Sequence, residues 1–153
     1  MMRAVVDTNI LIRALIKPYG TVGPVVARLR DGDYVIVYSS PLLDELITKL
    51  ALPRMRVKYR VQTELVEALV STIILRGERV IPTRQIKLCR DPNDDMFIEA
   101  AVAGQAPYVV TGDDDLLTLK KFENVRFITP RAFLATLYGI LSEVQQGEHP
   151  EDG

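Results

Sequence analysis

Short apolar runs alternate along this chain with longer segments whose apolar residues recur at helical spacing. Five runs are predicted to be strands, at residues 3–7, 34–38, 79–81, 108–110 and 125–128. Helices are expected between them, at about 10–17, 22–30, 40–50, 61–76 and 92–104, with a short helix at 116–117 and a terminal one at 130–141. Alternation of this kind favours a parallel sheet covered by helices on both faces, so the predicted fold class is α/β.

The length and composition predict one soluble domain. A chain of 153 residues with 48% hydrophobic and 25% charged residues can bury a core of its own. We expect a single domain over residues 1–142 and a disordered acidic tail over residues 143–153. No apolar stretch is long enough to span a membrane, and the N-terminus leads directly into strand-like sequence. The expected location is therefore the cytoplasm.

Two rare residues restrict the chemistry. The chain has one histidine, His149, which lies in the predicted tail, so a Ser-His-Asp triad, a two-histidine ribonuclease mechanism and a histidine-rich metal site are all excluded. Its one cysteine, Cys89, excludes an internal disulfide and a multi-cysteine zinc site, and we expect it to be buried or half-buried. Any catalysis must therefore use carboxylates and a bound metal ion.

Four acidic residues stand where strands meet helices. They are Asp7, Glu45, Asp95 and Asp113. Because the carboxyl ends of parallel strands share one edge of a sheet, these side chains are expected to lie close together. Carboxylate oxygens are the ligands that Mg²⁺ and Mn²⁺ prefer. A bound metal ion lowers the pKa of water and stabilises charge on a phosphodiester, so the pattern predicts phosphate chemistry.

Each acidic position also has a purely structural interpretation. Asp7 can cap a helix, and Glu45 can be a solvated residue of a helix N-terminus, although the apolar positions around it make the neighbouring Asp44 the surface residue. Of the acids that crowd the start of the helix at 92–104, Asp91 and Asp94 are expected to cap the helix or face solvent.

The run Asp113-Asp114-Asp115 can likewise cap a short helix. Asp113 directly follows a strand and is the better ligand candidate, with Asp115 second. Whether Asp113 or Asp115 completes the site stays open.

The segments around these acids resemble those of PIN-domain nucleases, and more closely the VapC-like toxins of bacterial and archaeal toxin–antitoxin pairs. The segments are Val-Val-Asp-Thr-Asn-Ile-Leu, the glutamate helix after the second strand, Asp-Asp-Met-Phe-Ile-Glu-Ala-Ala, and Val-Thr-Gly-Asp-Asp-Asp-Leu. The resemblance implies a three-layer α/β/α sandwich around a five-stranded parallel sheet. It also implies cleavage of single-stranded RNA with Mg²⁺ or Mn²⁺, a homodimer, and a cognate antitoxin as partner.

The resemblance also assigns roles to individual residues. Asp7, Glu45, Asp95 and Asp113 match the catalytic acids, and Asp7, Asp95, Asp113 and Asp115 are the metal ligands it implies. The supporting polar residues are Thr8, Asn9, Thr111 and a hydroxyl at Ser40 or Ser39.

A basic segment follows the second strand and its helix. We define the basic segment as Arg54, Arg56, Lys58 and Tyr59. It could bind phosphates and stack a base on Tyr59, but a solvated loop whose cations pair with nearby acids explains it slightly better.

Two other functions are compatible with part of the sequence. The first is a small Mg²⁺-dependent phosphatase or phosphotransfer enzyme. Haloacid-dehalogenase-like phosphatases, however, require a second aspartate at the position of Asn9. A receiver domain requires a phosphoacceptor aspartate after residues 80–81, and this chain has none there. The second is a non-catalytic PIN-like module that binds RNA or protein, which the complete acidic set disfavours. Dimerisation through the helices at 61–75 and 133–141 is only suggested, since core burial explains their apolar faces equally well.

Overall fold

The computed structural model describes the backbone of residues 1–148 and the side chains of residues 1–143; His149 lies outside the described residues. The strands are β1 (Arg3–Val6), β2 (Val35–Tyr38), β3 (Glu78–Arg79), β4 (Tyr108–Val110), β5 (Lys121–Phe122) and β6 (Val125–Ile128). The helices are α1 (Thr8–Ile16), α2 (Gly23–Arg30), α3 (Ser40–Leu50), α4 (Pro53–Val57), α5 (Thr63–Arg76), α6 (Pro92–Gly104), α7 (Asp114–Leu119) and α8 (Pro130–Glu148).

The strands form one sheet in the order β3-β2-β1-β4-β6-β5. The first five are parallel, which confirms the predicted parallel sheet, and β5 adds an antiparallel edge strand through its pairing with β6. β5 has only two residues, too few for an alternating pattern to show in the sequence. The strand order reverses between β1 and β4, the place where open α/β sheets bind ligands at the carboxyl ends of their strands.

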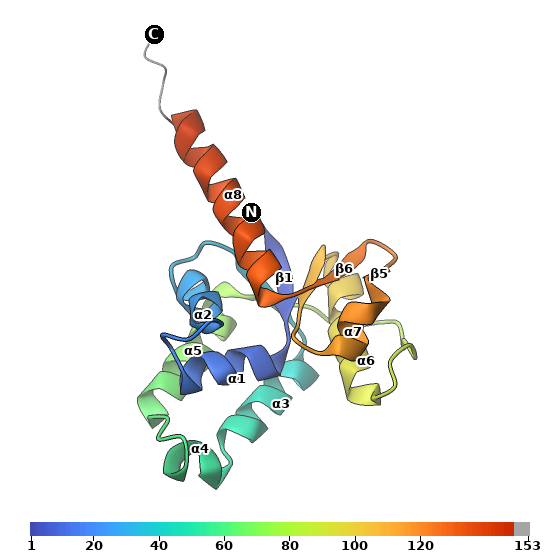
Figure 1. The fold of residues 1–153 in the computed structure, drawn as a ribbon. Helices are drawn as coiled ribbons and strands as arrows, with labels where there is room; N and C mark the ends of the chain where they lie inside the picture. Colours follow the sequence, from blue (N-terminus) through green and yellow to red (C-terminus); the bar gives the residue numbers. More distant parts are fainter. Residues whose placement is uncertain (149–153) are drawn as a thin grey trace.

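Helices cover both faces of this sheet (Figure 1). Successive residues of a strand point to opposite faces, so Ala4 and Val6 of β1 join the core beneath α1, α2, α5 and α8, whereas Val5 joins the core beneath α6 and α7. The three layers expected from the alternating sequence are therefore present. This explains why the central strands are apolar on both sides.

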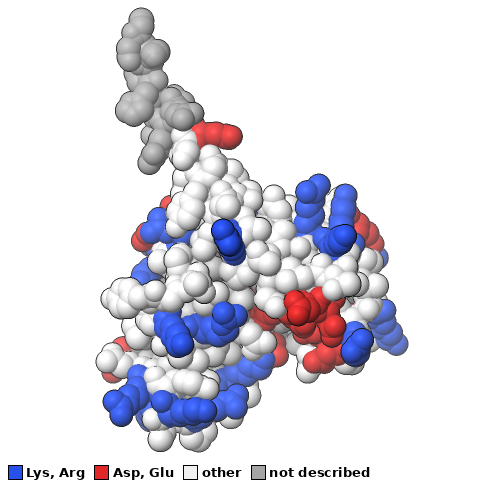
Figure 2. All heavy atoms as spheres, viewed as in Figure 1, with Lys and Arg blue, Asp and Glu red and all other residues white. Residues whose placement is uncertain are grey.

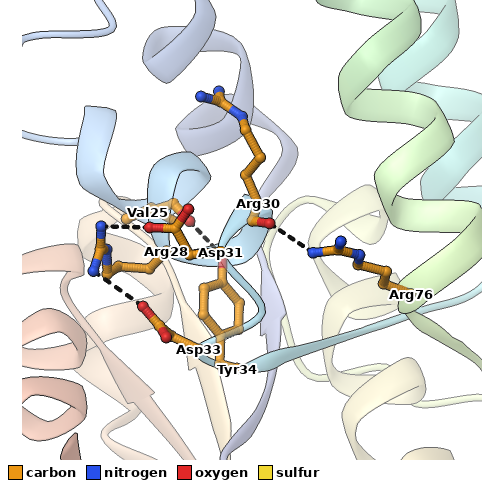
Figure 3. A network of polar contacts seen from close by, with 7 residues as sticks. All are labelled: Val25, Arg28, Arg30, Asp31, Asp33, Tyr34 and Arg76. Atoms are coloured by element: carbon orange, nitrogen blue, oxygen red, sulfur yellow. Dashed lines mark hydrogen bonds and ion pairs between the residues drawn. The ribbon is translucent and has the colours of Figure 1, made fainter.

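A polar network fixes α2 against the sheet and α5 (Figure 3). The buried Tyr34 hydroxyl donates to the Val25 carbonyl at 2.7 Å, and Arg28 pairs with Asp31 at 2.7 Å and with Asp33 at 3.0 Å. These contacts tie both ends of the α2–β2 connection together. Arg76 of α5 donates to the Arg30 carbonyl at 2.6 Å, and α2 also packs against α1, which begins at the acidic edge of the sheet.

Two segments differ from the expectation. The basic segment starts within a short helix, α4, instead of a loop, with Pro53 at its first turn. α8 continues to Glu148, so residues 143–148, which were expected in the tail, form the end of a helix that extends away from the body of the molecule (Figure 1). Among the described helices, none combines the length and apolar character needed to cross a membrane.

Candidate active site

Asp7 is the buried centre of the acidic group. It follows β1 directly and caps α1, and it is only 3% exposed. Its carboxylate accepts the Asn9 backbone N–H at 2.9 Å and the Thr111 hydroxyl at 2.8 Å. Burial raises the pKa of Asp7, while these two hydrogen bonds and the charge of Lys49 act in the opposite direction. Capping and site formation thus use the same carboxylate.

Thr111 connects Asp7 to Asp113. Its hydroxyl donates to Asp7 and accepts the backbone N–H of Asp113 at 3.0 Å, although β1 and β4 are far apart in sequence. Asp113 in turn caps α7 by accepting the N–H of Asp115 at 3.0 Å. One buried hydroxyl therefore fixes the relative position of two acids on adjacent strands.

Glu45 faces the same edge from α3. It is half-buried and its neighbour Asp44 is exposed, so the inner position falls where the apolar pattern placed it. The Thr8 hydroxyl lies 3.4 Å from one Glu45 oxygen, and the Lys49 ammonium lies 3.1 Å from the other. The negative charge of Glu45 also raises the pKa of Asp7, although less than burial does.

Asp94, which was expected to cap or face solvent, belongs to this group. Its carboxyl lies close enough to Asp113 for the charge of Asp113 to raise its pKa. Partial burial, together with the negative charges of Asp113, Asp91 and Asp7, raises its pKa to about 7. The cap itself is Asp91, whose carboxylate accepts the Asn93 N–H at 2.9 Å.

Asp95, the predicted ligand, has a different environment. It is 6% exposed, and one carboxylate oxygen accepts the backbone N–H groups of Leu88 at 3.0 Å and Cys89 at 2.7 Å. Glu99, one turn later on α6, accepts the Ile86 N–H at 2.8 Å. This face of α6 therefore holds the preceding loop, whereas the pKa of Asp94 responds to the charge of Asp113.

The remaining predicted residues divide between the edge and the surface. Ser39, not Ser40, is the buried hydroxyl, at 1% exposure, and it caps α3 by accepting the Leu42 N–H at 3.4 Å. Ser40 and Asp115 have exposed side chains. Cys89 is half-buried as expected, and burial together with its hydrogen bond to Asp95 raises the pKa of its thiol to about 12.

The donor set of this edge fits a hard divalent cation. Asp7, Asp94 and Asp113 offer only carboxylate oxygens, and their mutual repulsion is the condition that a cation relieves. As the side chains stand, no three His, Cys, Asp or Glu residues of the described chain converge tightly enough to enclose an ion. A metal ion would have to draw these carboxylates together.

The cations of the basic segment are exposed and make no ion pair with the acids of the described residues. Arg56 donates to the Thr63 hydroxyl at 3.1 Å, and the Lys58 ammonium lies 5.2 Å from the centre of the Tyr59 ring. Figure 2 shows basic side chains over α4 at the lower end of the molecule and a separate acidic patch near α7. The expectation of a loop neutralised by nearby acids is therefore not met.

Two cations at the edge were missed by sequence reasoning. Lys49 contacts Glu45 and also lies 3.4 Å from the Asn9 side-chain oxygen. Arg13 reaches the loop after β4, since a Cβ added to Gly112 would lie 3.7 Å from its guanidinium. Lys49 lies four positions after Glu45, and Arg13 lies four positions after Asn9. Residues at this spacing share one face of a helix, so the sequence did contain a signal for both cations.

Known proteins resemble this chain in sequence and in fold. The family model for the PIN domain matches residues 3–115. An uncharacterized protein of Methanocaldococcus jannaschii, MJ1680, is 29% identical over 142 residues, covering 87% of this chain and 90% of the relative. A chain of the crystal structure of VapBC2 from Rickettsia felis, bound to a DNA fragment from their promoter, superposes with a TM-score of 0.52 at 18% identity, covering 84% of this chain and 98% of that one. The last similarity is one of fold.

Proposed function

The chain belongs to the PIN-domain family, whose members are generally nucleases, and we propose that it is a metal-dependent endoribonuclease that hydrolyses single-stranded RNA. The observation that carries the proposal is the carboxylate group formed by Asp7, Asp94 and Asp113 at the point where strand order reverses. Carboxylates that repel one another at this position of an α/β sheet are suited to hold Mg²⁺ or Mn²⁺.

Asp7, Asp94 and Asp113 would hold the metal ion, with Glu45 and Asp115 beside them. When bound, the ion supplies an activated water and stabilises charge on the phosphodiester. The protein's own part is positioning: Thr111 fixes Asp7 relative to Asp113, and Thr8 holds one oxygen of Glu45. Asp95 acts as a positioning residue in this proposal, because it anchors the loop that precedes Asp94.

The basic segment is proposed to bind the RNA backbone. Its cations are exposed and unpaired with acids of the described chain, so they can contact phosphates without first breaking an ion pair. Tyr59 is partly exposed and could stack on an unpaired base. Single strands fit this arrangement because their bases are free to stack.

We further propose that the protein is the toxin of a toxin–antitoxin pair, acts in the cytoplasm and forms a homodimer. The similarity to a chain of VapBC2 supports an antitoxin partner. So does an apolar groove of about 470 Å³ between α3, α4 and α5, whose lining includes Ile47, Leu52 and Val57. Co-purification with the product of an adjacent gene and light scattering of the isolated protein test the two assemblies.

The test is cleavage of a labelled single-stranded RNA with Mg²⁺ or Mn²⁺, with and without EDTA. Asp7→Asn and Asp94→Asn should each lose most of the metal-dependent rate, because each removes a ligand charge. Asp44→Asn is the matched control, since it removes the same charge from the exposed position beside Glu45. Equal cleavage by all these proteins would indicate a contaminating nuclease and contradict the proposal.

Two further readouts separate the alternatives. A phosphatase would turn over a chromogenic phosphomonoester, whereas the proposed nuclease should not. A non-catalytic binding module would show no saturable Mn²⁺ binding by calorimetry. RNA cleavage together with saturable binding would exclude both.

A further inference from the structure

Lys49 is a cation placed inside the acidic edge. Its ammonium lies 3.1 Å from a Glu45 oxygen and 3.4 Å from the side-chain oxygen of Asn9, which belongs to another helix. Its positive charge also lowers the pKa of Asp7. The side chain is 33% exposed, so it is partly open to solvent while it contacts Glu45.

An ordinary helix ion pair explains only part of this arrangement. A glutamate four residues before a lysine stabilises an exposed helix by a few tenths of a kcal/mol and needs no third partner. Here the ammonium turns toward α1 and shares its donors between Glu45 and Asn9. The contact therefore belongs to the site as well as to the helix.

The contacts of Glu45 show what Lys49 controls. One Glu45 oxygen lies 3.4 Å from the Thr8 hydroxyl, and Lys49 occupies the other. A metal ion at Glu45 would compete with the ammonium, because two cations on one carboxylate repel each other. A displaced ammonium on this partly exposed side chain could then pair with a phosphate.

We propose that Lys49 couples metal binding to RNA binding: its ammonium competes with the metal ion for Glu45 and, once released, binds a phosphate of the substrate. The inference rests on the proposed nuclease function and adds a residue and a regulation to that site. Without RNA, the metal ion is then bound less tightly than it would be if Lys49 did not compete for Glu45. Metal in the presence of RNA is held more tightly, because linkage requires the two effects to be reciprocal.

Removing the charge should therefore move two binding constants in opposite directions. Lys49→Met should tighten Mn²⁺ binding about fivefold, at the low end of typical coupling, since Lys49 is partly exposed to screening solvent. The same variant should weaken RNA binding about fivefold when metal is bound, because a phosphate contact is lost. Lys49→Arg keeps the charge and should return both constants toward wild type.

The experiment measures Mn²⁺ affinity by calorimetry, and the affinity for a fluorescein-labelled single-stranded RNA by anisotropy, without metal and with Ca²⁺. A gel shows that the RNA stays intact. Arg28→Met is the control, since it removes one positive charge from an ion pair on α2, where its partners are Asp31 and Asp33 (Figure 3). It should leave both constants within about twofold of wild type, as distant exposed charges are screened.

Each outcome decides the proposal. Tighter Mn²⁺ binding together with weaker Ca²⁺-dependent RNA binding supports it. Unchanged or weaker Mn²⁺ binding by Lys49→Met would mean that Lys49 only orients Glu45. RNA binding that weakens equally with and without Ca²⁺ would mean a phosphate contact independent of metal. Either result overturns the coupling.

The nuclease proposal fails separately. If wild type cleaves RNA with metal while Lys49→Met shows neither shift, the coupling is wrong and the nuclease stands. If Lys49→Met binds Mn²⁺ more tightly but no variant binds or cleaves RNA, the nuclease proposal and the coupling both fail, and only the competition for Glu45 survives.

Discussion

Asp94 and Asp95 are adjacent on the first turn of α6, and their removal should change stability in opposite directions. Asp95 accepts two backbone N–H groups and is almost fully buried. Leaving each donor without a partner costs about 1–3 kcal/mol, and partial access of water to the loop brings the expected total for Asp95→Ala to about 2–4 kcal/mol. For a domain of this size, that lowers Tm by about 5–15 °C.

Asp94→Asn should instead stabilise the protein at high pH. The pKa of Asp94 is raised from 3.8 to about 7, so the folded protein favours the protonated carboxyl. Ionisation of this carboxyl therefore lowers the free energy of unfolding progressively between pH 4 and pH 7, and the loss is complete above pH 7. At about 1.4 kcal/mol per pH unit the full penalty is about 4 kcal/mol. Because Asp94 is partly exposed, solvent screening reduces this to about 1–2 kcal/mol.

The assay is thermal unfolding of metal-stripped protein followed by circular dichroism at pH 4 and pH 8. Asp94→Asn should raise Tm by about 3–6 °C at pH 8 and change it little at pH 4, where the native carboxyl is already neutral. Asp114→Asn, at an exposed neighbouring acid, serves as the control and should not shift Tm at either pH. A lower Tm for Asp94→Asn at pH 8, or a wild-type Tm for Asp95→Ala, would contradict the roles assigned to these two carboxylates.

Three other predictions concern the cap of α3, the anchor of α2 and the RNA path. Ser39→Ala should lower the free energy of unfolding by about 1 kcal/mol in urea, because it removes the side-chain cap of α3. Ser40→Ala should lower it by no more than a few tenths of a kcal/mol, and equal losses would contradict this assignment of the cap. Tyr34→Phe should cost about 1–2 kcal/mol in the same assay, since it leaves the Val25 carbonyl without its donor; an unchanged urea midpoint would show that another group satisfies it. Replacing the three cations of the basic segment with alanine should weaken RNA binding more at low salt than at high salt, as measured by anisotropy across a salt series; unchanged binding would remove this segment from the RNA path.

Much of the fold could be predicted because its signals are local. Buried strands such as 108–110 and helix boundaries such as Pro18 and Gly104 depend on residues next to one another in the chain. The reversal of strand order beside Asp7 and Asp113 follows from the pairing of β1 with β4, a contact between distant segments that no local pattern predicts. The helix α4 and the strand β5 were missed, because two to five residues carry too little periodic pattern.

The acidic site was harder to predict than the fold. One step along a helix turns a side chain by about 100°, so the choice between Asp94 and Asp95 depends on which face of α6 meets the loop at 86–89. That contact is made by backbone N–H groups of Ile86, Leu88 and Cys89, which carry no sequence signal. The same limitation applies to Ser39 and Ser40, where only the burial of one hydroxyl separates two identical residues.

The proposed metal site can be tested by the anomalous difference map of a crystal soaked in Mn²⁺. We expect a peak bounded by carboxylate oxygens of Asp7, Asp94 and Asp113, with Asp95 still bound to the backbone of Leu88 and Cys89. Metal–oxygen distances should be close to 2 Å, as for small hard cations. A peak coordinated by Asp95, or no peak at this edge in crystals of protein that cleaves RNA with Mn²⁺, would contradict the proposed site.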